Sequence, residues 1–281
     1  MKKISFQGEP GANSHIACEQ ARPGWEALPC ATFEDAFAAV NEGAADLAMI
    51  PIENSIAGRV ADIHHLLPES GLAIVGEHFL PIHFHLMAPR GAALERIAQV
   101  HSHVHALGQC RNIIRRLGAK AVVAGDTAGS AREVAERGDL THASLAPPMA
   151  AQIYGLDVLA ENVEDEPHNA TRFVILAREP QWPAAGGGPC ATAFVFRVRN
   201  VPAALYKAMG GFATNGVNMT KLESYQLEGS FTATQFYVEI EGHPEDPPVA
   251  RAMEELNFFC TEMRVLGVFP AMQFRTARTA A

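Results

Sequence analysis

Cysteine is scarce in this 281-residue sequence: there are five, at positions 18, 30, 110, 190 and 260, and no C-x-x-C pair among them. An odd number of widely spaced cysteines does not fit a disulfide framework, so we expect reduced thiols in a cytoplasmic protein. Long hydrophobic runs are missing as well, and a membrane-spanning helix needs about 20 apolar residues. The two lysines near the N-terminus are not followed by the apolar segment of a signal peptide. We therefore expect neither a membrane partner nor export.

Positive charge is also in deficit. The sequence holds 22 lysines and arginines against 31 aspartates and glutamates, a formal net charge of −9. This balance argues against nucleic acid as the main partner, because phosphate binding requires a basic surface. With 48% hydrophobic and 19% charged residues, the composition is that of a globular protein. A small anionic ligand would need a local group of cations.

Short apolar segments alternate with helical patterns over the first 180 residues. Ile4-Ser5-Phe6 runs into a glycine turn at 8–15 that opens a helix, and the buried strand 46–50 is followed by polar residues. Further strands are expected near 72–79, 82–88, 98–101, 120–124, 141–145 and 157–160. This alternation predicts an α/β fold, in which polar residues beyond the carboxyl ends of strands meet ligands.

Capping residues predict several helix starts. Thr32 to Asp35 match a capping box, and Asp126 to Ser130 match a simple N-cap. Ser102 is the expected N-cap of a helix over 103–117, which would place Gln109 two turns along on the same face.

Five histidines alternate in two groups, His83 with His85, and His101 with His103 and His105. Zinc binds imidazole, but three alternating histidines would have to lie on one strand, and a helix is expected to begin within this group. No H-E-x-x-H motif or Cys/His pairing accompanies them. We therefore interpret them as ordinary histidines and predict no metal site.

A hydroxyl and a cation, Thr171 and Arg172, open the short apolar strand 173–176. Such a pair at the end of a buried strand suits a small anionic ligand. The alternative is that Thr171 caps a turn and Arg172 pairs with the carboxylates at 164–166, because charged strand ends are ordinary.

The composition changes between residues 181 and 190, where glycine and proline predict a linker. Beyond it we expect strand 192–199, helix 202–213, strands 217–225 and 232–240, helix 247–257 and strand 261–269. The order β-α-β-β-α-β is ferredoxin-like. The sequence thus predicts domains at 1–180 and 191–273, and a loose tail from Gln273 onward.

From Ile4 to Pro270 the chain resembles the prephenate dehydratases. The matching segments are Gly8-x-x-Gly11-x-x-Ser14, Pro51-Ile52-Glu53-Asn54-Ser55-x-x-Gly58, Ser102-His103 with Ala106-Leu107-x-Gln109-Cys110, Thr127-Ala128, Tyr154-Gly155-Leu156 and Asn169-x-Thr171-Arg172-Phe173. Beyond the linker, Leu205-Tyr206-Lys207 and Asn218-x-Thr220-Lys221-x-Glu223-Ser224 resemble an ACT domain. The resemblance implies two α/β lobes like those of a periplasmic binding protein, with the site in the cleft between them, and a ferredoxin-like ACT domain.

The resemblance also implies a lyase that converts prephenate to phenylpyruvate with loss of carbon dioxide and water, without a metal or organic cofactor. The catalytic residues it implies are Thr171, Arg172, Asn54, Ser102 and Gln109, and the substrate-binding residues are Glu53, Ser55, Ser14, Thr127 and Phe173. Thr171 would assist the departing hydroxyl through a hydrogen bond or proton relay, since a free alcohol is a poor acid. Arg172 would hold a substrate carboxylate.

ACT domains of this family pair side by side and bind phenylalanine where they meet, which implies a homodimer or homotetramer with L-phenylalanine as effector. The positions that match this site are Ala204, Leu205, Asn218, Glu223 and Ser224. In this segment Ala203 replaces the usual glycine, and Tyr225-Gln226 replaces Arg-Pro, which are departures from the family pattern.

Two alternatives stay open. Arogenate, the amino analogue of prephenate, fits the same residues as substrate. A two-lobed small-molecule binding protein without chemistry would share the fold.

Overall fold

The computed structural model describes residues 1–199, 201–226 and 233–272. Two compact units form: Met1–Val60 with Phe79–Phe173, and Ala61–His78 with the chain from Val174 onward. The tail predicted to be loose and Thr232, the first residue of a predicted strand, lie outside the described residues. Among the described helices, none combines the length and the apolar character needed to cross a membrane.

The first sheet has the strand order β2-β1-β3-β11-β5, with β4 paired to β3. Its strands are β1 (Lys3–Gln7), β2 (Glu26–Cys30), β3 (Leu47–Asn54), β4 (Gly58–Arg59), β5 (Ala73–Pro81) and β11 (Ala170–Ala177). The helices along this part of the chain are α1 (Asn13–Ala21), α2 (Phe33–Asn41) and α3 (Ala61–Glu69). Ile4, Ser5 and Phe6 are all fully buried, as expected for a parallel strand covered on both faces.

The second sheet has the order β10-β6-β9-β7-β8. Its strands are β6 (His85–Ala88), β7 (Gln99–Ser102), β8 (Lys120–Val123), β9 (His142–Ala146) and β10 (Asp157–Ala160). The helices of this lobe are η1 (Leu94–Arg96), α4 (Val104–Gln109), α5 (Arg111–Leu117), α6 (Thr127–Arg137) and α7 (Pro148–Tyr154). The predicted two-lobed α/β architecture is therefore confirmed.

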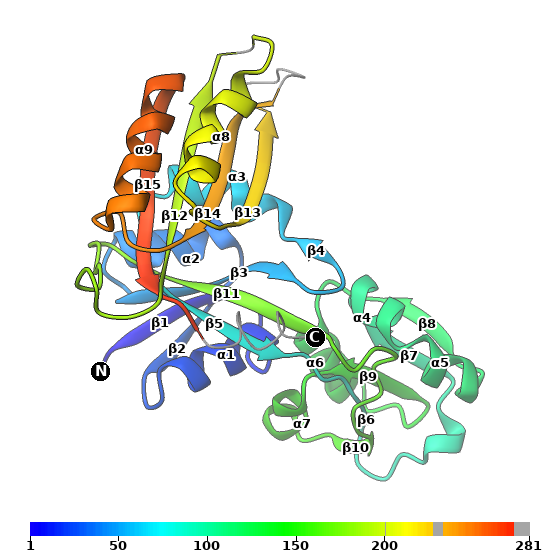
Figure 1. The fold of residues 1–281 in the computed structure, drawn as a ribbon. Coiled ribbons are helices and arrows are strands. Elements are labelled where there is room, and N and C mark those ends of the chain that lie inside the picture. Colours follow the sequence, from blue (N-terminus) through cyan, green and yellow to red (C-terminus); the bar gives the residue numbers. More distant parts are fainter. Residues whose placement is uncertain (200, 227–232, 273–281) are drawn as a thin grey trace. The chain divides into compact units, whose positions relative to one another are not determined.

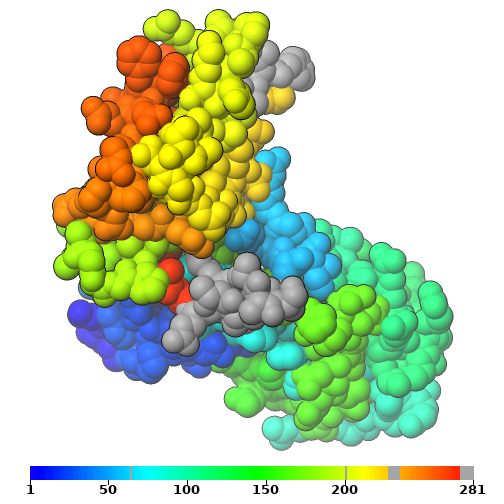
Figure 2. All heavy atoms as spheres, in the orientation of Figure 1, coloured from blue at the N-terminus to red at the C-terminus, as the bar shows by residue number. Residues whose placement is uncertain are grey.

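A third sheet, β13-β14-β12-β15, forms the main part of the second unit. It contains β12 (Cys190–Val198), α8 (Ala204–Thr214), β13 (Met219–Gln226), β14 (Ala233–Glu241), α9 (Pro247–Phe259) and β15 (Cys260–Pro270). Both helices lie on one face of the sheet (Figure 1), and in the space-filling view their yellow and orange atoms cover it (Figure 2). Phe194, Phe212 and Leu256 belong to the apolar core between the helices and the sheet. The predicted ferredoxin-like order is confirmed.

Two local predictions are confirmed and one is wrong. Thr32 forms the capping box with Asp35, and Asp126 accepts from the Gly129 N–H at the start of α6. The helix predicted over 103–117 is instead two helices separated at Cys110, and Ser102 does not cap the first. Ser102 is the last residue of β7, so it shares no helix face with Gln109.

The physical reasons are contacts from distant parts of the chain. The Ser102 hydroxyl donates to the Leu145 carbonyl at 2.6 Å, and the ring of His103 takes the capping position. The carboxylate of Asp165 accepts from the backbone N–H of Arg111 at 2.8 Å. This hydrogen bond stabilises the start of a second helix, α5, where the local sequence predicts that one helix continues.

Candidate active site

The end of β3 and the beginning of β11 bring Asn54 and Thr171 together. The side-chain amide nitrogen of Asn54, Nδ2, lies 3.0 Å from Thr171 Oγ1 and donates to it. No other hydrogen bond of the Thr171 hydroxyl occurs within the described residues, so its own hydrogen stays available for a ligand. Both residues are half-buried, where a side chain is held in place but still reachable.

The orientation of the Asn54 amide follows from the turn after β3. Its oxygen, Oδ1, accepts hydrogen bonds from the backbone N–H groups of Ile56, at 3.0 Å, and Ala57, at 2.8 Å. Backbone N–H groups can only donate, so the atom that faces them must be the oxygen. The nitrogen therefore points toward Thr171, and the Asn54 side chain is a fixed donor to that hydroxyl.

Asn169 is a functional candidate that the sequence prediction omitted. Its side chain is 3% exposed; its oxygen accepts from Asn54 Nδ2 at 2.7 Å and its nitrogen donates to Gln109 Oε1 at 2.8 Å. Asn54 and Gln109, predicted as catalytic, are thus joined through it. The signal in the sequence was its place in the matching segment Asn169-x-Thr171-Arg172-Phe173.

Arg172 is buried at 4% exposure beside the same group. Its Nη1 pairs with Glu53 Oε1 at 2.9 Å, and its guanidinium lies 5.8 Å from the centre of the Phe79 ring. The Glu53 carboxylate fixes the direction of the guanidinium, and the face of the Phe79 ring attracts its positive charge. Glu53 therefore positions the cation.

Ser55, predicted as substrate-binding, is engaged by the backbone. Its hydroxyl donates to the His168 carbonyl at 2.9 Å and accepts from the Ala170 N–H at 2.9 Å. These bonds hold the segment before Thr171 against the end of β3. The position of Ser55 therefore gives it a role in shaping the site.

Four other predicted residues lie apart from this group in the described part of the chain, where no hydrogen bond links them to Asn54, Asn169 or Thr171. Ser102 is fully buried and its hydroxyl donates to the Leu145 carbonyl, and Phe173 is a core residue at 1% exposure. Ser14 lies in the first turn of α1, and Thr127 is the first residue of α6. Their predicted roles stay predictions.

The alternating histidines fall on different elements. His101 lies on β7 and stacks on His142, with Nε2 of His101 3.0 Å from Nδ1 of His142. Burial, followed by the neighbouring His142 and Arg137, lowers the pKa of His101. Among the described residues, no three histidine, cysteine, aspartate or glutamate side chains are grouped so as to hold a metal ion.

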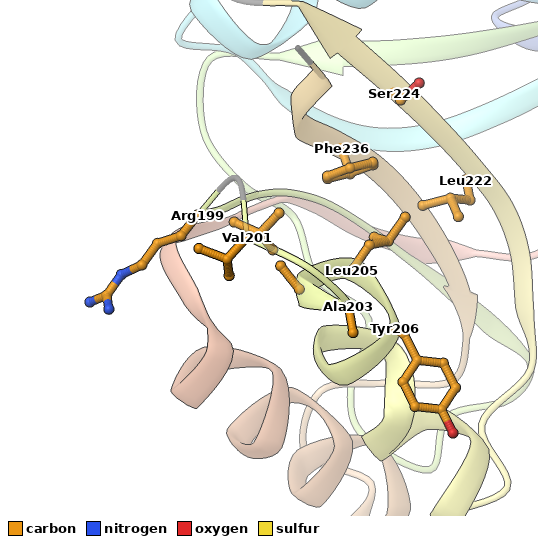
Figure 3. A pocket seen from close by; sticks show the side chains of 10 residues that line it. Arg199, Val201, Ala203, Leu205, Tyr206, Leu222, Ser224 and Phe236 are labelled. Carbon is orange, nitrogen blue, oxygen red and sulfur yellow. The ribbon is translucent and has the colours of Figure 1, made fainter.

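A separate hollow of about 490 Å³ lies in the second unit, between the start of α8 and strands β13 and β14. Three of the residues predicted for effector binding, Ala204, Leu205 and Ser224, line it, whereas Asn218 and Glu223 do not. Figure 3 shows the side chains of Leu205, Leu222 and Phe236 at the hollow, which Arg199 and Tyr206 also line. The lining suits a small molecule with an apolar part.

Comparison with known proteins places these features in a wider group. A family model described as prephenate dehydratase matches residues 4–181. A bifunctional N-acyl-homoserine lactone acylase/prephenate dehydratase of Komagataeibacter europaeus is 54% identical over 272 residues, which cover 97% of each chain. A chloroplastic arogenate dehydratase/prephenate dehydratase of Arabidopsis thaliana is 39% identical, over 95% of this chain and 72% of the plant protein.

Among solved structures, prephenate dehydratase from Arthrobacter aurescens in complex with L-Phe matches with a TM-score of 0.87 at 32% identity. The match covers 96% of this chain and 90% of that one. The likeness therefore includes the two lobes and the ferredoxin-like sheet.

Proposed function

Because the chain belongs to the prephenate dehydratase family, we propose that it converts prephenate to phenylpyruvate, carbon dioxide and water in phenylalanine biosynthesis. In this reaction the bond from the ring to its carboxylate breaks, and the electron pair enters the new aromatic ring. The bond to the 4-hydroxyl breaks at the other end of the ring, and the departing hydroxide takes up one proton to leave as water. Aromatisation favours the products, so the protein has to hold the substrate and assist the leaving oxygen.

The hydrogen bond from Asn54 to Thr171 carries this proposal. Since Thr171 Oγ1 accepts from Asn54, its hydrogen is directed elsewhere and can be donated to the leaving hydroxyl. A hydrogen bond that strengthens as negative charge develops lowers the barrier of the chemical step. If the proton itself is transferred, Thr171 acts as a relay that takes up another proton from water, because an alcohol is too weak an acid to stay ionised.

Two further groups complete the proposed site. Arg172 would bind a substrate carboxylate, with Glu53 holding the guanidinium in place. The amide nitrogen of Gln109, Nε2, makes no hydrogen bond within the described residues and would donate to a substrate oxygen. Prephenate and arogenate differ only in the keto or amino group of the side chain, so both are substrates to be tested.

The test follows turnover of both substrates by the wild type and by two variants of Thr171. Phenylpyruvate is measured by its absorbance in alkali, and phenylalanine from arogenate by chromatography. Thr171→Val keeps the shape and removes the hydroxyl, so kcat should fall about 100- to 1,000-fold, as when one transition-state donor is removed. Thr171→Ser keeps the hydroxyl and should retain most of the rate. Equal rates for valine and serine would overturn the role of Thr171, and no turnover of either substrate by the wild type would overturn the reaction.

We also propose that residues 1–180 carry catalysis and that 191–273, joined by the linker 181–190, form an ACT domain that binds L-phenylalanine. The hollow lined by Leu205 supports this, and the relative from Arthrobacter aurescens was solved with L-Phe. A cytoplasmic homodimer or homotetramer, paired through these domains, is part of the proposal. Leu205→Asp should abolish the heat of L-phenylalanine binding in calorimetry, whereas Phe258→Ala, which changes an exposed residue of α9 outside the lining of the hollow, should preserve it. Binding unchanged by Leu205→Asp would place the effector elsewhere.

The 54% identical relative from Komagataeibacter europaeus has a second activity in its name, and this likeness favours one additional candidate function. That candidate is hydrolysis of the amide bond of an N-acyl-homoserine lactone, with release of homoserine lactone and a fatty acid. Incubation with such a lactone and detection of the free amine tests it. The same Thr171→Val variant then decides whether the two activities share a site.

A further inference from the structure

Three side-chain amides form a continuous chain of hydrogen bonds from the turn after β3 to the end of α4. The Asn54 nitrogen donates to the Asn169 oxygen at 2.7 Å, and the Asn169 nitrogen donates to Gln109 Oε1 at 2.8 Å. The first member is held by two backbone N–H groups that bond its oxygen. Each amide has one accepting end and one donating end, so the direction of the first determines the directions of the others.

Reversal of any one amide would be unfavourable. If the Asn169 side chain turned over, its nitrogen would face the nitrogen of Asn54 and its oxygen would face Gln109 Oε1. Donor would then meet donor and acceptor would meet acceptor at a residue that is 3% exposed, where water does not readily replace the lost bonds. The chain of amides is therefore directional, from the backbone of residues 56 and 57 to the outer nitrogen of Gln109.

We propose that Asn169 is a positioning residue that turns the amide of Gln109 so that its nitrogen, and not its oxygen, faces the substrate. This inference rests on the proposed dehydratase function and adds to it a residue that was not among the predicted site residues. Within the part of the chain that the structure describes, Asn169 is linked by hydrogen bonds to Thr171 through Asn54, and it would act on the substrate through Gln109. The result is that Thr171 and Gln109 both present hydrogen-bond donors to a substrate that carries two carboxylates and a leaving hydroxyl.

The decisive variant is Asn169→Asp, which has nearly the same shape but loses the donor when it is ionised. The introduced carboxylate still accepts from Asn54, but it cannot donate to Gln109 Oε1, so the Gln109 amide turns and offers its oxygen to an anionic substrate. We expect kcat at pH 8 to fall about 10- to 100-fold, the range seen when an outer-shell orienting group is lost, with less change in KM. Burial at this 3% exposed position should raise the pKa of the introduced carboxyl above its ordinary value of about 3.9. Protonation restores the donor, so the ratio of variant to wild-type activity should rise as the pH is lowered from 8 to 5.5.

Two matched variants separate orientation from general damage. Asn169→Ala removes the donor at every pH, so its activity should be low without recovery at acidic pH. Asn112→Asp places the same new charge on an exposed residue of α5 in the same unit, and its pH profile should follow the wild type. If the activity of Asn169→Asp changes with pH in parallel with that of the wild type, whatever its absolute value, the proposal is overturned.

A measurement independent of turnover keeps this inference separate from the proposed function. In ¹⁵N-labelled protein, the side-chain amide protons of Asn169 are identified by their loss in Asn169→Asp. Hydrogen bonding to Gln109 should slow their exchange with water, and Gln109→Ala should accelerate it at least several-fold. Exchange unaffected by Gln109→Ala would overturn the amide chain, whereas absence of wild-type turnover with protected amide protons would overturn only the dehydratase function.

Discussion

The side-chain amide of Asn54 donates a 3.0 Å hydrogen bond to the hydroxyl oxygen of Thr171. Asn54→Asp keeps the oxygen that accepts from Ile56 and Ala57, so the turn should fold normally. The second carboxylate oxygen would replace the donor, and the Thr171 hydroxyl would then donate to it instead of to the substrate. We expect kcat for prephenate to fall about 100- to 1,000-fold, as for loss of a transition-state donor, with intact circular dichroism. A kcat within threefold of the wild type would contradict this role.

The guanidinium of Arg172 is buried against Glu53 and Phe79, which makes its geometry as important as its charge. Arg172→Lys preserves the charge but cannot bond a carboxylate in two places or stack on the ring. Loss of one charged hydrogen bond to the substrate corresponds to about 1.5–3 kcal/mol, so kcat/KM should fall roughly 10- to 150-fold, mainly through KM. Steady-state kinetics with prephenate measures this. A change confined to kcat, with KM unaltered, would show that Arg172 acts on the chemical step and not on binding.

The alternation of strands and helices was predictable because it depends on neighbouring residues, and so was the capping box of Thr32. The break between the two helices at Cys110 was not predictable. The carboxylate that caps α5 belongs to Asp165, which lies 54 positions after Arg111 in the sequence. Asn169 was missed for the same reason: its partners Gln109 and Asn54 lie 60 and 115 positions away. Patterns of period 2 or 3.6 do not report such contacts. The residue types at 171 and 172, a hydroxyl and a cation, pointed to the site. The orientation of the amides depends on hydrogen bonds between residues far apart in the sequence.

Burial of His101 beside His142 should make the stability of the protein depend on pH. Burial, and then the nearby His142 and Arg137, lower the pKa of His101 from its ordinary 6.5, and Asp139 faces the other side of His142 at 3.8 Å. As the pH falls below 6.5, the unfolded chain binds a proton at this position that the folded chain does not. The free energy of unfolding therefore falls with pH in this window, down to the lowered pKa, by at most about 1.4 kcal/mol per pH unit for one group.

Urea unfolding of the wild type and of His101→Gln between pH 8 and pH 5 checks this dependence. The variant should lose less stability per pH unit than the wild type. Some dependence should remain, because burial also lowers the pKa of His15 and His103. Identical slopes for the two proteins would show that His101 is not the group responsible.

Gly267 on β15 lies against the backbone of Ile74 on β5, within the same compact unit. A Cβ at this position would come within 2.7 Å of Ile74 Cβ and 2.8 Å of its carbonyl carbon. Backbone atoms cannot turn away as a flexible side chain can, so the strands would have to separate. Gly267→Ala should reduce the free energy of unfolding by about 1–3 kcal/mol, the usual range for an overpacked core.

Gly210→Ala is the matched control for that substitution, because it adds the same methyl group to the same unit. Gly210 lies inside α8 with open space around the added Cβ, and alanine is the better helix former by about 1 kcal/mol. Urea unfolding should therefore show Gly210→Ala at or above wild-type stability and Gly267→Ala below it. Equal stability of the two variants would mean that β15 and Ile74 are not in close contact in solution.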